Sequence, residues 1–126
     1  MIHKYKLNGF NMVIDAASGA VHSVDEVAYD AIERLDAAVR DSGDDAKRVF
    51  GDSGLMSEIA SEISQEHGIT PEDAAETLED IAELYENRLL WSEDPFEQAA
   101  DEIKIKQSVL KAICLHVAHG CNMDCE

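Results

Sequence analysis

An Asn-Gly dipeptide at positions 8–9 constrains the fold more than any other feature of this sequence. Both residues tolerate positive φ angles, which a two-residue hairpin turn requires. The flanking residues, 2–7 and about 10–15, alternate between apolar and polar as half-buried strands do. A second turn at 17–19 and a third strand at 20–24 complete a predicted three-stranded antiparallel meander, which has two open edges.

After this sheet, apolar residues recur every three to four positions, the spacing of a helix that buries one face. Ser23 and Glu26 form a capping-box pattern, which predicts the start of a first helix that ends at about Val39. Residues 41–54 are rich in Asp, Ser and Gly and are predicted to be a loop. A second helix is expected from about Leu55 to the region of His67 and Gly68, where glycine suits a left-handed cap.

A third helix is predicted over residues 71–88, with Thr70 as its cap and Pro71 in its first turn. Residues 89–91 then form either a short strand or a clasp that packs on the domain. The order predicts an α+β fold with three strands and three helices in a domain of residues 1–91. Because a short turn joins the last two helices, we expect a helix-turn-helix unit and a winged-helix-like domain.

The remainder of the chain is expected to lie outside this domain. Residues 92–108 are charged, include an Asp-Pro step and are predicted to be a linker. Residues 109–117 form an apolar run of strand length that leads to two cysteines, Cys121 and Cys125.

Net charge excludes several classes of function. The chain carries 27 acids against 10 bases, a formal charge of −17. The predicted 71–88 helix has seven acids and one base, so it is unsuited to a nucleic-acid groove, where binding depends on Lys and Arg. No run of 18 apolar residues and no signal peptide are present, so we expect a cytoplasmic protein that neither spans nor binds a membrane.

The two terminal cysteines have the spacing that begins a C-x3-C-x2-C motif. In that motif three thiolates hold three irons of a cubane iron–sulfur cluster and leave the fourth iron open. A third cysteine would fall two positions beyond Glu126, so we expect the chain to be the N-terminal part of a larger enzyme. A zinc site formed by His116, His119, Cys121 and Cys125 is the alternative.

No catalytic motif occurs in this sequence: it lacks G-x-S-x-G, a P-loop and H-E-x-x-H. The feature that suggests a function is the open edge of the third predicted strand, because an extended peptide can add to such an edge through backbone hydrogen bonds. The acidic third helix beside it would favour a basic or polar peptide.

Three stretches of sequence resemble a known family. Residues 2–15 and 18–30 are similar to the N-terminus of the radical SAM maturases of SCIFF (six-cysteine) peptides, which install thioether cross-links in ribosomally made precursors. Residues 110–125 resemble the first barrel strand of these enzymes and the cluster loop that follows it.

The resemblance implies that residues 1–91 recognise the leader of a precursor peptide, which adds beside the third strand and against the third helix. Carried over by position, the peptide-binding residues are Ala20, Val21, His22, Ser23, Val24, Leu78, Ile81, Ala82 and Tyr85. Cys121 and Cys125 would be two of the three ligands of a [4Fe–4S] cluster that binds S-adenosylmethionine in the intact parent. Without the third ligand we expect no cofactor and no catalysis here.

Two other hypotheses about the function remain open. One is that the relevant activity belongs to the intact parent, which would cleave S-adenosylmethionine, abstract hydrogen from the peptide and form a carbon–sulfur bond. The other is a structural or oligomerisation domain, in which the apolar residues 109–117 could pair two copies of the chain.

Overall fold

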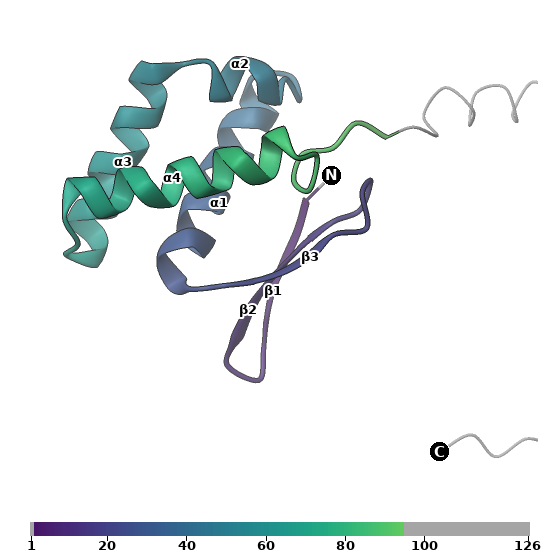
Figure 1. The fold of residues 1–126 in the computed structure, drawn as a ribbon, viewed down its shortest axis with the longest axis horizontal. Coiled ribbons are helices and arrows are strands. Elements are labelled where there is room, and N and C mark those ends of the chain that lie inside the picture. The colour runs from purple at the N-terminus through teal and green to yellow at the C-terminus, as the bar shows by residue number, and fades with distance from the viewer. Residues whose placement is uncertain (1, 95–126) are drawn as a thin grey trace, which may run out of the picture. The chain divides into compact units, whose positions relative to one another are not determined.

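The chain begins with a three-stranded antiparallel sheet. The computed structural model describes residues 2–94, and its strands are β1 (Ile2–Leu7), β2 (Phe10–Asp15) and β3 (Val21–Val24), in the order β1-β2-β3 (Figure 1). Asn8 and Gly9 have φ angles of 51° and 84°, which confirms the predicted hairpin turn. The predictions made for residues 95–126 lie outside the described residues.

The two faces of the sheet have different environments. The face toward the helices carries Ile2, Val13 and Asp15, all of which are buried. The opposite face, here called the outer sheet face, is apolar but exposed to a large extent. Its apolar residues are Tyr5, Leu7, Phe10, Met12, Ile14 and Val21.

Four helices follow the sheet and lie on one side of it (Figure 1). They are α1 (Glu26–Asp41), α2 (Ala46–Phe50), α3 (Ser53–His67) and α4 (Pro71–Glu86). Helix α1 packs against β2, α3 and α4, so it lies at the centre of the domain. Its Ile32 and Leu35 are fully buried together with Val13 and Ile63, and these aliphatic side chains form the middle of the core.

The prediction of three helices was wrong, because α2 lies inside the segment predicted to be a loop. Asp45 caps this short helix by accepting a hydrogen bond from the Arg48 backbone N–H at 3.0 Å. Ala46 and Val49 are buried against the core. Five residues are too few to show a helical period, whereas the burial of two apolar side chains is enough to hold one turn in place.

The predicted capping box at Ser23 was also wrong. Ser23 lies in β3 opposite Met12, and the cap of α1 is Asp25, whose side chain accepts a hydrogen bond from the Ala28 backbone N–H at 2.8 Å. Strand pairing therefore holds Ser23 in the sheet, and Asp, an equally good cap, starts the helix two residues later. Helix α1 consequently begins at Glu26 and continues past Val39 to Asp41.

The predicted end of α3 and the predicted start of α4 are confirmed. Gly68 ends α3 in the left-handed conformation with a φ of 64°, and its N–H bonds to the Ser64 carbonyl. Thr70 caps α4 through a hydrogen bond from the Asp73 N–H, and Pro71 is its first residue. The helix ends at Glu86, two residues earlier than expected.

Residues 88–92, which we call the clasp, follow α4 and fold back on the domain without forming a strand. Leu90 is fully buried, and the Trp91 indole N–H donates to the Asp36 carboxylate at 3.3 Å. The Ser92 backbone N–H donates to the Asp15 carboxylate at 3.1 Å. Arg88 and Trp91 have φ angles of 58° and 49°, a backbone conformation that is uncommon for residues other than glycine.

Truncating Leu90 tests whether the clasp belongs to the core. We expect Leu90→Ala to lower the free energy of unfolding by about 3 kcal/mol, because it removes a fully buried side chain and leaves a cavity. Its neighbour Leu89 is 38% exposed, so Leu89→Ala should cost less than about 1 kcal/mol. Urea unfolding followed by circular dichroism measures both. Equal, small losses would show that the clasp does not contribute to the core.

Candidate functional site at the β3 edge

Strand β3 forms one edge of the sheet, since within residues 2–94 it pairs with β2 alone. The Asp15 backbone N–H donates to the Ala20 carbonyl at 3.0 Å. Because hydrogen-bonded and non-hydrogen-bonded pairs alternate along antiparallel strands, this bond identifies the β3 residues that bond to β2. Residues His22 and Val24 therefore direct their backbone groups to β2, while Val21 and Ser23 direct theirs outward. The edge thus offers two N–H and two C=O groups to an added strand.

Side chains along β3 alternate between the two faces of the sheet. His22 and Val24 lie toward the helices, where Val24 packs against the core, and both are half-buried. Val21, which is 56% exposed, and Ser23 lie on the outer sheet face. Ala20 precedes the strand, so the prediction that β3 starts there was wrong by one residue; its N–H bonds to the Ser18 hydroxyl in the turn.

The clasp lies beside β3 on the helix side. The His22 Nε2 atom is 3.3 Å from the carbonyl oxygen of Leu89, to which it donates in the tautomer protonated at that nitrogen. Trp91 makes an edge contact with Phe50, whose ring stacks on that of Tyr85 at 4.5 Å between centroids. The clasp therefore links β3 to an aromatic group formed by α2 and α4.

A buried carboxylate, Asp15, holds the clasp on the sheet. It accepts hydrogen bonds from the Ser92 N–H, the Ser18 hydroxyl at 3.0 Å and the Ala17 N–H at 3.3 Å. Burial alone would raise the pKa of Asp15, but the hydrogen bonds from Ser92, Ser18 and Ala17 outweigh it and hold the pKa below its ordinary value. The carboxylate is therefore ionised at neutral pH, and it joins the turn before β3 to the clasp.

The predicted binding residues on α4 do not share one surface. Ile81 is buried in the core, and Tyr85 is half-buried under Phe50. Leu78, which is also buried in the core, and Ala82 line a groove between α3 and α4. Their role in peptide binding remains a prediction, and α4 presents residues to the core, to the aromatic group and to this groove.

The α3–α4 groove was not anticipated from the sequence. Its volume is about 580 Å³, and it is lined by residues of both helices, with small side chains on much of its floor. The lining residues are Met56, Ser57, Ala60, Ser61, Ser64, Gln65, Pro71, Ala75, Leu78, Glu79 and Ala82. A periodic alanine and serine pattern on two neighbouring helices could have suggested it.

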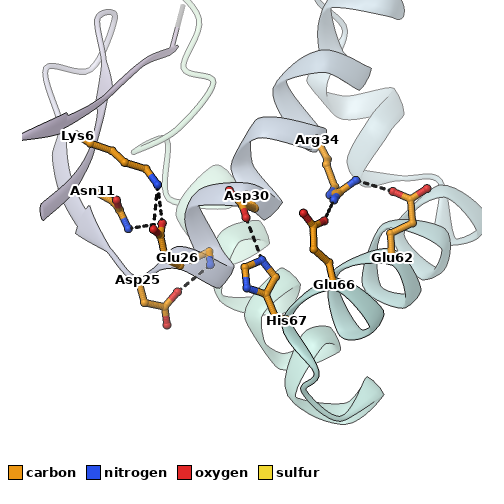
Figure 2. A network of polar contacts seen from close by, with 10 residues as sticks. Lys6, Asn11, Asp25, Glu26, Asp30, Arg34, Glu62, Glu66 and His67 are labelled. Atoms are coloured by element: carbon orange, nitrogen blue, oxygen red, sulfur yellow. Dashed lines mark hydrogen bonds and ion pairs between the residues drawn. The ribbon is translucent and has the colours of Figure 1, made fainter. Parts of the chain in front are cut away.

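Most of the basic side chains near the sheet and α1 are paired with acids. Figure 2 shows the pairs made by Lys6 and Arg34. Lys6 bonds to Glu26 at 2.8 Å, which raises the pKa of Lys6 and lowers that of Glu26. Arg34 of α1 reaches both Glu62 and Glu66 of α3. None of the ion pairs within residues 2–94 includes an acid of α4.

His67, at the end of α3, bonds through Nε2 to the Asp30 carboxylate at 2.9 Å and so ties α3 to α1 (Figure 2). Among residues 2–94 there is no group of three or more side chains suited to hold a metal ion. In the same part of the chain, no helix is long and apolar enough to cross a membrane. The predicted cluster ligands Cys121 and Cys125, and the zinc alternative with His116 and His119, lie outside the described residues.

Neither a protein-family model nor a curated protein sequence matches this chain. The function is therefore inferred from the geometry of the site and from the sequence resemblance.

Replacing Asp15 tests the buried carboxylate. A folded-state pKa below the ordinary value of 3.8 means that the ionised group stabilises the fold above that pH, and that this stabilisation is lost as the pH falls through the lowered value. We expect Asp15→Asn to lower the free energy of unfolding by about 1–3 kcal/mol at pH 7, and the difference from the parent chain to shrink below about pH 4.

Urea unfolding at a series of pH values measures this difference. Asp41→Asn, at the exposed end of α1, is the control and should change the free energy of unfolding by less than about 0.5 kcal/mol. A constant difference between Asp15→Asn and the parent chain from pH 7 to pH 3 would contradict the assigned role of the carboxylate.

Proposed function

We propose that residues 2–94 form a peptide-docking module in which an extended segment of a partner peptide adds to the edge of β3. The observation that carries this proposal is the outward orientation of the Val21 and Ser23 backbone groups on an edge strand. Each added backbone hydrogen bond gives affinity without requiring a particular side chain.

The surroundings of the edge supply selectivity. A peptide paired with β3 would extend both faces of the sheet and alternate its own side chains between them. On one face they would meet Val21 and the rest of the apolar outer sheet face. On the other they would lie near His22 and the clasp carbonyl of Leu89. The site therefore suits a peptide with apolar residues at alternate positions.

Charge narrows the class of peptide further. Two acids of α4 come before Ala74, and five more are spread to its end at Glu86. Such a helix repels acidic peptides and nucleic-acid phosphates at long range and attracts basic ones. A basic or polar peptide is therefore the proposed ligand, as the acid excess of the sequence also indicates.

A more specific proposal, which names the ligand and the enzyme it is delivered to, comes from the resemblance to SCIFF-peptide maturases. In it, residues 2–94 are a winged-helix-like domain with α3 and α4 as its helix-turn-helix pair, and the ligand is the leader of a precursor peptide. The module would deliver the cysteine-rich part of that peptide to a radical SAM domain for thioether formation in the cytoplasm. Tethering the substrate raises its local concentration at a distant active site.

Self-association is the second candidate function. Four large side chains of the outer sheet face are 40–61% exposed, namely Tyr5, Leu7, Phe10 and Val21. A contiguous exposed apolar patch commonly marks an interaction surface, and a second copy of the chain could cover it. Light scattering of the 126-residue chain separates this candidate from peptide docking, because docking requires no dimer.

Two substitutions at one position of β3 test strand addition. Ser23→Pro removes the outward N–H of the edge, and proline is tolerated on an edge strand where its nitrogen faces solvent. Ser23→Ala removes the hydroxyl and keeps the N–H, so it is the matched control. The probe is a fluorescein-labelled synthetic leader of a SCIFF precursor, titrated against the 126-residue chain by fluorescence anisotropy.

We expect Ser23→Pro to weaken binding by about tenfold or more, since it leaves one peptide carbonyl unpaired and brings a ring against the added strand. Ser23→Ala should stay within about twofold of the parent chain. Circular dichroism and urea unfolding establish that both variants are folded. Equal affinities for folded Ser23→Pro and Ser23→Ala, or no binding by the folded parent chain, would refute the proposal.

A further inference from the structure

The α3–α4 groove is a second apolar surface, separate from the β3 edge. No residue of the sheet or of α1 lines it. Residues 56–65 of α3 and 71–82 of α4 form its walls, so it extends over about three turns, or roughly 15 Å, of each helix. Ala60, Ala75 and Ala82 keep the floor low, which lets the backbone of a partner approach closely.

A row of glutamates borders this groove on α4. Glu79 lines it, and Glu72, Glu76 and Glu83 follow the same side of the helix at spacings of three and four residues. All four are exposed, and no ion pair within residues 2–94 includes them. Like charges at this spacing destabilise a helix, so a cationic partner along the row would relieve their repulsion.

We propose that this groove docks a basic amphipathic helix of a partner protein. Its apolar face would fill the floor near Leu78 and Ala82, and its Lys or Arg residues would face the glutamate row. The walls are helices whose backbone groups bond within themselves, so the groove offers no ladder to an extended chain. A helical partner satisfies its own backbone and needs only side-chain contacts there.

This inference is independent of the proposed peptide docking at β3, and its test uses a different probe. The probe is a fluorescein-labelled peptide of leucine and lysine, patterned as an amphipathic helix about five turns long. A scrambled peptide of the same composition, which cannot form an apolar face, controls for charge alone. Both are titrated against the 126-residue chain by fluorescence anisotropy at about 0.15 M salt.

Two charge-matched variants locate the binding surface. Ala75→Arg places a long cation on the groove floor, whereas Ala37→Arg makes the same change at an exposed position of α1. Both positions are exposed on helices and Arg is a good helix former, so both variants should fold. We expect Ala75→Arg to weaken binding of the patterned peptide by at least about tenfold and Ala37→Arg by less than about twofold.

The other occupants of the groove give different results. Equal weakening by the two variants, or equal binding of patterned and scrambled peptides, would mean nonspecific charge attraction and overturn the proposal. A dimer of the parent chain that Ala75→Arg alone converts to monomer in light scattering would assign the groove to a second copy, which also overturns it. Weakening of the patterned peptide by Ser23→Pro, but not by Ala75→Arg, would place that peptide on β3 instead.

Discussion

The buried Asp15 carboxylate is the interaction on which the arrangement of the domain depends. It lies at the end of β2, accepts hydrogen bonds from the turn that leads to β3, and accepts another from the backbone of the clasp. The hydrogen bonds oppose the cost of burying a charge and keep its pKa low. One side chain therefore joins the turn between β2 and β3 to the segment that follows the last helix.

This connection explains how the clasp contributes without regular structure. With Ser92 held on Asp15, Leu90 enters the core and Trp91 reaches Asp36 and Phe50. The Leu89 carbonyl is thereby placed beside His22 on the helix side of β3. The outer edge of β3 has no strand partner within residues 2–94, so the same contacts that complete the core leave the edge open to a ligand.

The two candidate surfaces would recognise different kinds of partner. At β3 the available groups are backbone N–H and C=O, which select an extended peptide. In the α3–α4 groove the available groups are small apolar side chains and glutamates, which select a helix with a basic face. A module with both surfaces could hold a substrate peptide and a partner protein together, because no residue of β3 lines the groove.

Local signals predicted the parts of the fold that depend on one or two residues. The Asn-Gly turn requires positive φ, and Thr70, Pro71 and Gly68 mark helix ends, so these features were found correctly. Helix α2 was missed because tertiary burial holds so short a helix.

The clasp and the groove were harder to predict. Arg88 and Trp91 adopt positive φ without glycine, and Trp91 is held by contacts with Asp36 and Phe50, which are far away in the sequence. The groove depends on the packing of α3 against α4, which the periodicity of each helix alone does not specify.

Residue-resolved amide hydrogen exchange tests the central claim, that the β3 edge is the docking site. In the free chain the His22 and Val24 amides should be protected by β2, while those of Val21 and Ser23 exchange rapidly. Saturating leader peptide should slow exchange at Val21 and Ser23 by at least about tenfold. Binding of the peptide with unchanged exchange at these two amides would contradict strand addition at β3.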